Sequence, residues 1–202
     1  TKEKDSLKGL PLELNFNPQS HRRGLATYFR SYLRGFMKKW TDENLKKDGT
    51  KYNLYVDGLK IYTTVNAEMQ QYAEEAVGEH MKNLQKEFFI QNDTLSTAPF
   101  RDLEEEDEEA IMNRTMKRSE RWRKMRLAGK SNEEIEASFE IPTNMTIFSW
   151  EGDIDTIMKP IDSIRYYKHF LQAGMMSMNP KNGHVMAWVG GINYRNFQYD
   201  HV

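Results

Sequence analysis

Apolar residues recur at three- and four-residue steps in two long stretches of the chain, which predicts two amphipathic helices. The second helix follows Asn66, a residue type that often caps helix N-termini, and its apolar stripe extends to Phe88. The first runs from Arg23 to Trp40, with arginine and lysine opposite its apolar face. Its stripe consists of Leu25, Tyr28, Phe29, Tyr32, Leu33, Phe36, Met37 and Trp40. We expect both helices to face the core, and a membrane-bound or partner-bound helix is the less favoured interpretation of the first.

Between these helices and after them, short stretches have the pattern of strands. Asp57 and Gly58 form the strongest short hairpin signal in the chain, flanked by the candidate strands 52–56 and 59–64. An alternating stretch at 10–16 predicts a short extended piece, and Pro11 near its start suggests an edge position.

A second hairpin is predicted close to the C-terminus. The apolar run Phe170–Met178 is followed by a Pro/Asn/Gly turn that includes Gly183, and then by an apolar run that ends at Gly190 and Gly191. Because two strands alone are marginally stable in water, this hairpin is expected to pack on helices or to pair with further strands.

Residues 98–142 differ sharply in composition and predict a small helical insertion. Asp102 is the expected cap of a first helix, with Glu105 three residues on, and acidic residues at its start give way to basic residues up to Arg126. Ser131 and Glu134 predict a second capping box. The next segments are interpreted as a strand at 145–150, a loop at 151–160 and a short helix at 161–169. Together the elements predict an α+β fold.

Charge and composition narrow the possible functions. The chain has 29 basic and 30 acidic residues, so no overall field selects nucleic acid or an anionic membrane. It has no cysteine, which excludes disulfides, thiolate metal sites and a cysteine nucleophile. Neither a membrane-spanning run nor a signal-peptide pattern is present, so any export or anchoring segment is expected outside this chain.

Candidate catalytic chemistry is absent from the sequence, and we predict no catalytic, metal-binding or cofactor-binding residue. No pair of histidines has metal-ligand spacing, and the acidic cluster at 104–109 is typical of a solvated helix face. Ser177 and Asn179 match S-x-N, a motif of serine acyltransferases. No serine is followed three residues later by lysine, so this match is interpreted as chance. The histidines are His21, His80, His169, His184 and His201.

Residues 127–142 have the cadence of a helix-turn-helix, with basic residues nearby. The segment 143–150, where the DNA-reading helix should follow, carries no arginine or lysine and has strand propensity. A DNA-binding protein is therefore the least favoured alternative. A non-enzymatic structural or peptide-binding module that uses the edge of the terminal hairpin is the other alternative.

Three stretches follow one another in the chain: residues 57–66 with 69–77, Asn179–Tyr194, and Phe197–Val202. In this order they resemble parts of the class A (bifunctional) penicillin-binding proteins of the 1A type. The first is similar to the opening of their transpeptidase domain, and the second resembles their first central hairpin. Phe197–Val202 looks like the lead into their catalytic helix. Gly24–Arg30 is similar to the linker after their glycosyltransferase domain, although Thr27 stands where that family usually has proline. The resemblance covers residues 10–90 and 145–202.

The resemblance implies an interior fragment of a bifunctional peptidoglycan synthase. Residues 1–51 would be the linker region, 52–97 the start of the transpeptidase domain, 98–142 the helical insertion, and 143–202 the continuation up to the central hairpin. The catalytic S-x-x-K serine is expected beyond Val202, so the fragment is expected to be inactive. The residues carried over are structural: Asp57, Gly58, Gly183, Gly190 and Gly191.

The resemblance also implies substrates and a location for the parent protein. Such enzymes act on lipid II, glycan strands and stem peptides, and β-lactams are expected to bind the parent only. The expected location is the periplasmic face of the inner membrane, where other cell-wall synthesis proteins are possible partners. No nucleic-acid partner is expected, and an unpaired strand edge predicts self-association.

Overall fold

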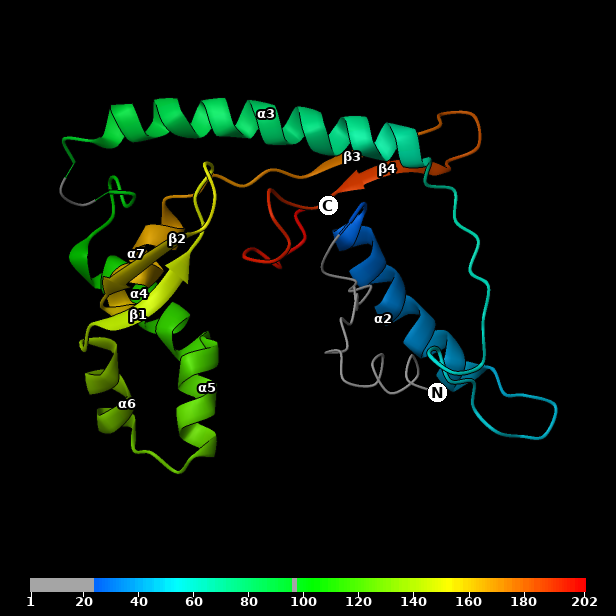
Figure 1. The fold of residues 1–202 in the computed structure, drawn as a ribbon, viewed down its shortest axis with the longest axis horizontal. Helices are drawn as coiled ribbons and strands as arrows, with labels where there is room; N and C mark the ends of the chain where they lie inside the picture. Colours follow the sequence, from blue (N-terminus) through cyan, green and yellow to red (C-terminus); the bar gives the residue numbers. More distant parts are fainter. Residues whose placement is uncertain (1–23, 96–97) are drawn as a thin grey trace, which may run out of the picture.

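The fold is α+β, as the sequence predicts, and consists of six helices and two small antiparallel sheets within residues 24–95 and 98–202 (Figure 1). These are the residues that the structure, a computed structural model, describes. The elements in chain order are α2 (Thr27–Glu43), α3 (Ala67–Asn92), α4 (Glu105–Arg118), α5 (Glu120–Leu127), α6 (Asn132–Phe139), β1 (Thr143–Ile147), β2 (Ile154–Met158), α7 (Pro160–Lys168), β3 (Met175–Met178) and β4 (Val185–Val189).

Helix α3 runs along the long axis, and the other elements are grouped at its two ends (Figure 1). The β3–β4 hairpin and α2 lie at its N-terminal half, whereas α4 to α7 and the β1–β2 hairpin lie near its C-terminal end. The side chain of Asn66 caps α3 by accepting a hydrogen bond from the Met69 N–H, as expected from the sequence.

Two buried glutamines join α3 to the segments beneath it. The Gln70 amide donates to the carbonyl of Trp188 at 2.8 Å and accepts from the N–H of Trp188 at 2.7 Å. The Gln85 amide donates to the carbonyl of His169 and accepts from the N–H of Leu171, both at 2.8 Å. Their exposed fractions are 0% and 1%, so neither amide has water as an alternative partner.

The predicted terminal hairpin is confirmed as β3 and β4, which pair with Met175 opposite Val189. Ala187 and Val189 of β4 are buried against Ala73 and Val77 of α3. The outer edge of β4 is also covered. Besides Gln70, the Asn66 N–H donates to the Met186 carbonyl at 2.9 Å, and the Thr64 hydroxyl donates to the Val185 carbonyl at 2.7 Å.

The helices after residue 98 share one core with α7. Met116, Trp122, Ile135 and Phe139 are buried together, and Ile161 and Ile164 of α7 pack against them. The Ser131–Glu134 capping box is formed, as predicted. The expected single helix is instead interrupted at Ser119, whose hydroxyl caps α5 by accepting from the Trp122 N–H.

Three local expectations are wrong. Glu104, not Asp102, is the N-cap of α4, since Asp102 has a left-handed φ of 62°. The predicted loop at 151–160 contains β2, which pairs with β1. The extended piece predicted at 10–16 is not one of the three, because it lies outside the described residues and stays a prediction.

The hairpin predicted at Asp57 and Gly58 is the third wrong expectation. Residues 52–56 and 59–64 contain no strand. The chain turns between Asn53 and Asp57. The Asn53 carbonyl accepts from the Asp57 N–H at 3.1 Å, and the Asp57 carboxylate accepts from the Asn53 N–H at 2.7 Å. A turn signal is local, whereas strands need a partner, and here the following segment uses the edge of β4 instead.

Removing either buried amide is expected to destabilise the protein. Gln70→Ala and Gln85→Ala each leave one buried N–H and one buried carbonyl without a partner, which costs about 1–3 kcal/mol. Gln71→Ala is the matched control, because Gln71 is an exposed residue of α3. It should change the free energy of unfolding by less than about 0.5 kcal/mol. Urea denaturation followed by circular dichroism measures all three, and equal effects would contradict the proposed role of the amides.

Candidate functional site

The candidate functional site is the segment 190–202, which leaves β4 and is held by α2 and by the helical end of the molecule. Gly190 and Gly191 are buried at its start. A Cβ on Gly190 would lie 2.7 Å from the Tyr28 ring and would overlap the Asp200 carboxylate, and one on Gly191 would overlap the Tyr28 hydroxyl. Only glycine therefore lets the chain pass between these two side chains.

Tyr28 of α2 is the anchor on one side. Its hydroxyl donates to the carbonyl of Phe197 at 2.6 Å, and its ring meets the Tyr194 ring edge to face at 5.0 Å. The Tyr194 hydroxyl in turn donates to the Ser31 hydroxyl at 2.7 Å. Burial raises the pKa of the Tyr28 hydroxyl well above its usual range, and the Asp200 carboxylate adds to this effect.

The end of the segment returns to β4. The Asp200 carboxylate accepts from the indole N–H of Trp188 at 3.0 Å, and the His201 N–H donates to the Gly190 carbonyl at 2.8 Å. The Trp188 ring stacks on Tyr32 at 5.3 Å. Residues 190–201 thus form a closed loop beside the hairpin.

On the other side, the Phe197 ring enters an aromatic cluster. It contacts Phe148 at 5.6 Å, Tyr167 at 5.7 Å and Phe170 at 5.7 Å between ring centroids. Phe148 and Phe170 are themselves buried and meet edge to face at 5.2 Å. Phe197 therefore has its carbonyl bound by α2 and its ring bound by the β1–β2 and α7 region.

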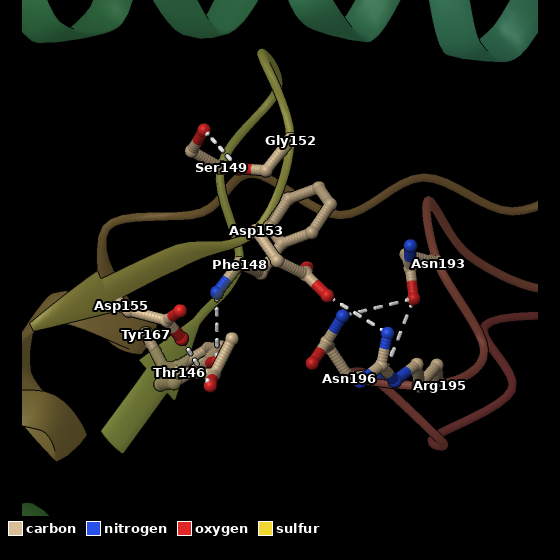
Figure 2. A network of polar contacts seen from close by, with 10 residues as sticks. All are labelled: Thr146, Phe148, Ser149, Gly152, Asp153, Asp155, Tyr167, Asn193, Arg195 and Asn196. Atoms are coloured by element: carbon tan, nitrogen blue, oxygen red, sulfur yellow. Dashed lines mark hydrogen bonds and ion pairs between the residues drawn. The ribbon is translucent and has the colours of Figure 1, made fainter. Parts of the chain in front are cut away.

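A polar network borders this cluster (Figure 2). Arg195 pairs with Asp153 of the β1–β2 loop at 2.8 Å, and Asn193 Oδ1 accepts from both the backbone N–H and the side-chain amide of Asn196 at 3.2 Å. The Tyr167 hydroxyl accepts from the Phe148 N–H at 3.1 Å. The loop and the terminal segment are thus tied by charge as well as by aromatic packing.

The five residues named from the sequence do not converge. Gly190 and Gly191 lie in the segment, whereas Gly183 has a φ of 71° in the β3–β4 turn. Asp57 pairs with Lys46 at 2.6 Å, and this contact lowers the pKa of its carboxyl group. Gly58 follows it with a φ of 63°. Within residues 24–95 and 98–202, no group of three acidic or histidine side chains could hold a metal ion.

The sequence analysis missed the roles of Tyr28 and Asp200. The available signal was the paired glycines, which require bulky groups opposite them. No pattern in the sequence says which groups those are, because Tyr28 lies more than 160 residues away from Gly190.

Comparison with protein families gives one match. Residues 95–171 match the family model described as the penicillin-binding protein middle domain. This match supports a penicillin-binding protein family for the chain. It covers α4 to α7 and both strands of the first hairpin, and so includes all of the predicted insertion at 98–142. A penicillin-binding protein family indicates a membrane-associated protein with a role in cell-wall synthesis.

No curated protein and no solved structure matches the chain. In the part of the chain that the structure describes, none of the helices combines the length and the apolar character that crossing a bilayer requires.

The Tyr28 contact predicts a specific alkaline sensitivity. Tyrosine ionises near pH 10 in the unfolded chain, whereas the folded state raises the pKa of Tyr28. The unfolded state therefore binds fewer protons above pH 10, and stability should fall as pH rises from about 10. In Tyr28→Phe this decline should be shallower than in the wild type, whereas Tyr62→Phe, at an exposed position, should keep the wild-type slope. Denaturation between pH 8 and about 11.5 tests this, and equal slopes in both variants would refute it.

The packing of the Phe197 ring should contribute more to the free energy of unfolding than the Arg195–Asp153 ion pair does. Phe197→Ala is expected to lower the free energy of unfolding by about 2–3 kcal/mol, since the ring is half-buried. Arg195→Gln should cost less than about 1 kcal/mol, because the pair with Asp153 is solvent-exposed. Urea denaturation compares the two, and a larger loss for Arg195→Gln would reverse the ranking.

Proposed function

We propose that this chain is part of a class A, bifunctional peptidoglycan synthase that combines a lipid II glycosyltransferase with a serine D,D-transpeptidase. One observation carries the proposal. The middle-domain match at 95–171 falls between stretches that resemble the opening of the class A transpeptidase domain, at 57–77, and its first central hairpin, at 179–194. The order of these three stretches is that of one continuous domain.

The proposed role of this part is structural. Its 202 residues contain no S-x-x-K serine, and the segment 197–202, which resembles the lead into the catalytic helix, is held at Phe197 by Tyr28 and by the aromatic cluster. The chain would therefore set the position from which the catalytic helix starts. The parent would act on lipid II, glycan strands and stem peptides at the periplasmic face of the inner membrane, anchored by a segment outside this chain.

A non-enzymatic interaction module is the second candidate, and the exposed edge of β3 favours it. Met175, Met176 and Met178 are 41–49% exposed, and β3 pairs only with β4 among the described strands. Such an edge could add a strand of a partner or a second copy. The helix-turn-helix alternative loses support, because β1 occupies Thr143–Ile147, where the DNA-reading helix would follow α6.

A fluorescent penicillin distinguishes these proposals. The 202-residue chain should show no covalent label in a denaturing gel, because it lacks the nucleophile that opens the β-lactam ring. The full-length protein from the same gene should be labelled, and pre-incubation with unlabelled penicillin should abolish the label. Labelling of the chain alone, or an unlabelled but folded full-length protein, would overturn the proposal.

A further inference from the structure

A cavity of about 470 Å³ lies between the C-terminal half of α3 and the tip of the β1–β2 hairpin. Its walls are largely aromatic or apolar, formed by Phe89, Ile90, Trp150, Tyr166 and Phe170. Phe89 and Ile90 are 39% and 62% exposed, so part of the wall faces solvent. This size is in the range of sites for small ligands and short peptide segments.

The rim of the cavity is cationic and includes one exposed amine that pairs with none of the described residues. Lys82 pairs with Glu151 across the mouth at 2.9 Å. For Lys86, one turn further along α3, no ion pair or hydrogen bond is formed with any described residue. The rim therefore carries one net positive charge beside an apolar wall.

Two further polar groups at the cavity lack partners within the described chain. The indole N–H of Trp150 is buried and has no acceptor. The solvent-exposed amide of Asn83, on the rim, makes no hydrogen bond to any described residue. By contrast, the Gln85 amide donates to the His169 carbonyl, and the Tyr166 hydroxyl donates to the Phe148 carbonyl at 2.7 Å. The Trp150 N–H has almost no accessible surface, so a ligand in the cavity would contact the Trp150 ring and not this donor.

We propose that this cavity binds the C-terminal residue of a peptide or protein partner, with an apolar side chain in the aromatic pocket and the carboxylate at Lys86. The charge selects an anionic group, and the aromatic walls select an apolar group attached to it. The free amide of Asn83 suits a peptide group, which a simple fatty or aromatic acid lacks. The ligand would bridge α3 and the hairpin loop that also carries Asp153.

Indole N–H signals provide a direct test. The chain has four tryptophans, so the ¹H–¹⁵N spectrum contains four indole signals, and Trp150→Phe identifies the one from Trp150. Titration with N-acetyl-Gly-Phe should shift that signal saturably. The C-terminally amidated peptide should bind about tenfold more weakly, because it loses the charge-assisted hydrogen bond to the amine.

Two variants should change the affinity in opposite directions. Lys86→Gln should weaken binding of the free-acid peptide about fivefold to tenfold. Glu151→Gln should strengthen it, because it removes a negative charge from the rim and frees Lys82. Lys181→Gln, in the distant β3–β4 turn, is the control and should leave the affinity unchanged. Misfolding would weaken binding in both rim variants, so opposite signs report electrostatics.

Three outcomes would overturn the proposal. The first is a Trp150 signal that does not move at millimolar peptide while the four indole signals remain dispersed. The second is equal affinity for the acid and the amide. The third is equal affinity for 3-phenylpropionate and the peptide, which would assign the cavity to small apolar acids instead of peptide C-termini.

Discussion

The structure depends on two buried glutamine side chains of α3 that hydrogen-bond to distant backbone groups. A glutamine carboxamide carries N–H donors and a carbonyl acceptor side by side, so it can pair with both the N–H and the carbonyl of a backbone. Gln70 uses it on Trp188 of β4, and Gln85 uses it on His169 and Leu171 after α7. The two residues are fifteen positions apart on one helix, or about 22 Å. Helix α3 thereby fixes the spacing between the terminal hairpin and the helical end of the molecule.

The spacing between the hairpin and the helical end determines where the segment 190–202 lies. Its polar backbone is held from the hairpin side by Tyr28, and its Phe197 ring is held from the other side by Phe148 and Phe170. If either end shifted along α3, one of these contacts would be lost, because each is a short-range contact. Ala26 strengthens the arrangement, since its N–H donates at 2.7 Å to Glu74, which also accepts from the Gln70 amide. The start of α2, helix α3 and the hairpin therefore share one hydrogen-bond network.

How much of this was predictable depends on whether the signal is local. Hydrophobic periodicity predicted α2 and α3, and capping residues predicted the starts of α3 and α6, because these signals depend on neighbours within a turn or two. Asp57 and Gly58 did turn the chain, but a hairpin also needs two strands that find each other, and these did not. The short strand Ile154–Met158 was missed because its exposed and half-buried positions give little alternation. In the sequence, Gln70 and Gln85 resemble the solvated polar residues of a helix. They are buried by backbone groups that lie far away along the chain.

The range that matches the family model depends on contacts with α3, which lies before it. The match ends at residue 171, and the N–H of Leu171 is the group bound by Gln85, which lies before the matched range. Phe170 packs against Phe89, also before the range, with ring centroids 6.1 Å apart. The matched segment therefore does not close its own aromatic core, although Met116, Trp122, Ile135 and Phe139 give it a separate helical one. Its attachment to α3 contributes to its stability as well as to its position. The matched range thus contains one complete core, the helical one, and only part of the aromatic core that it shares with α3.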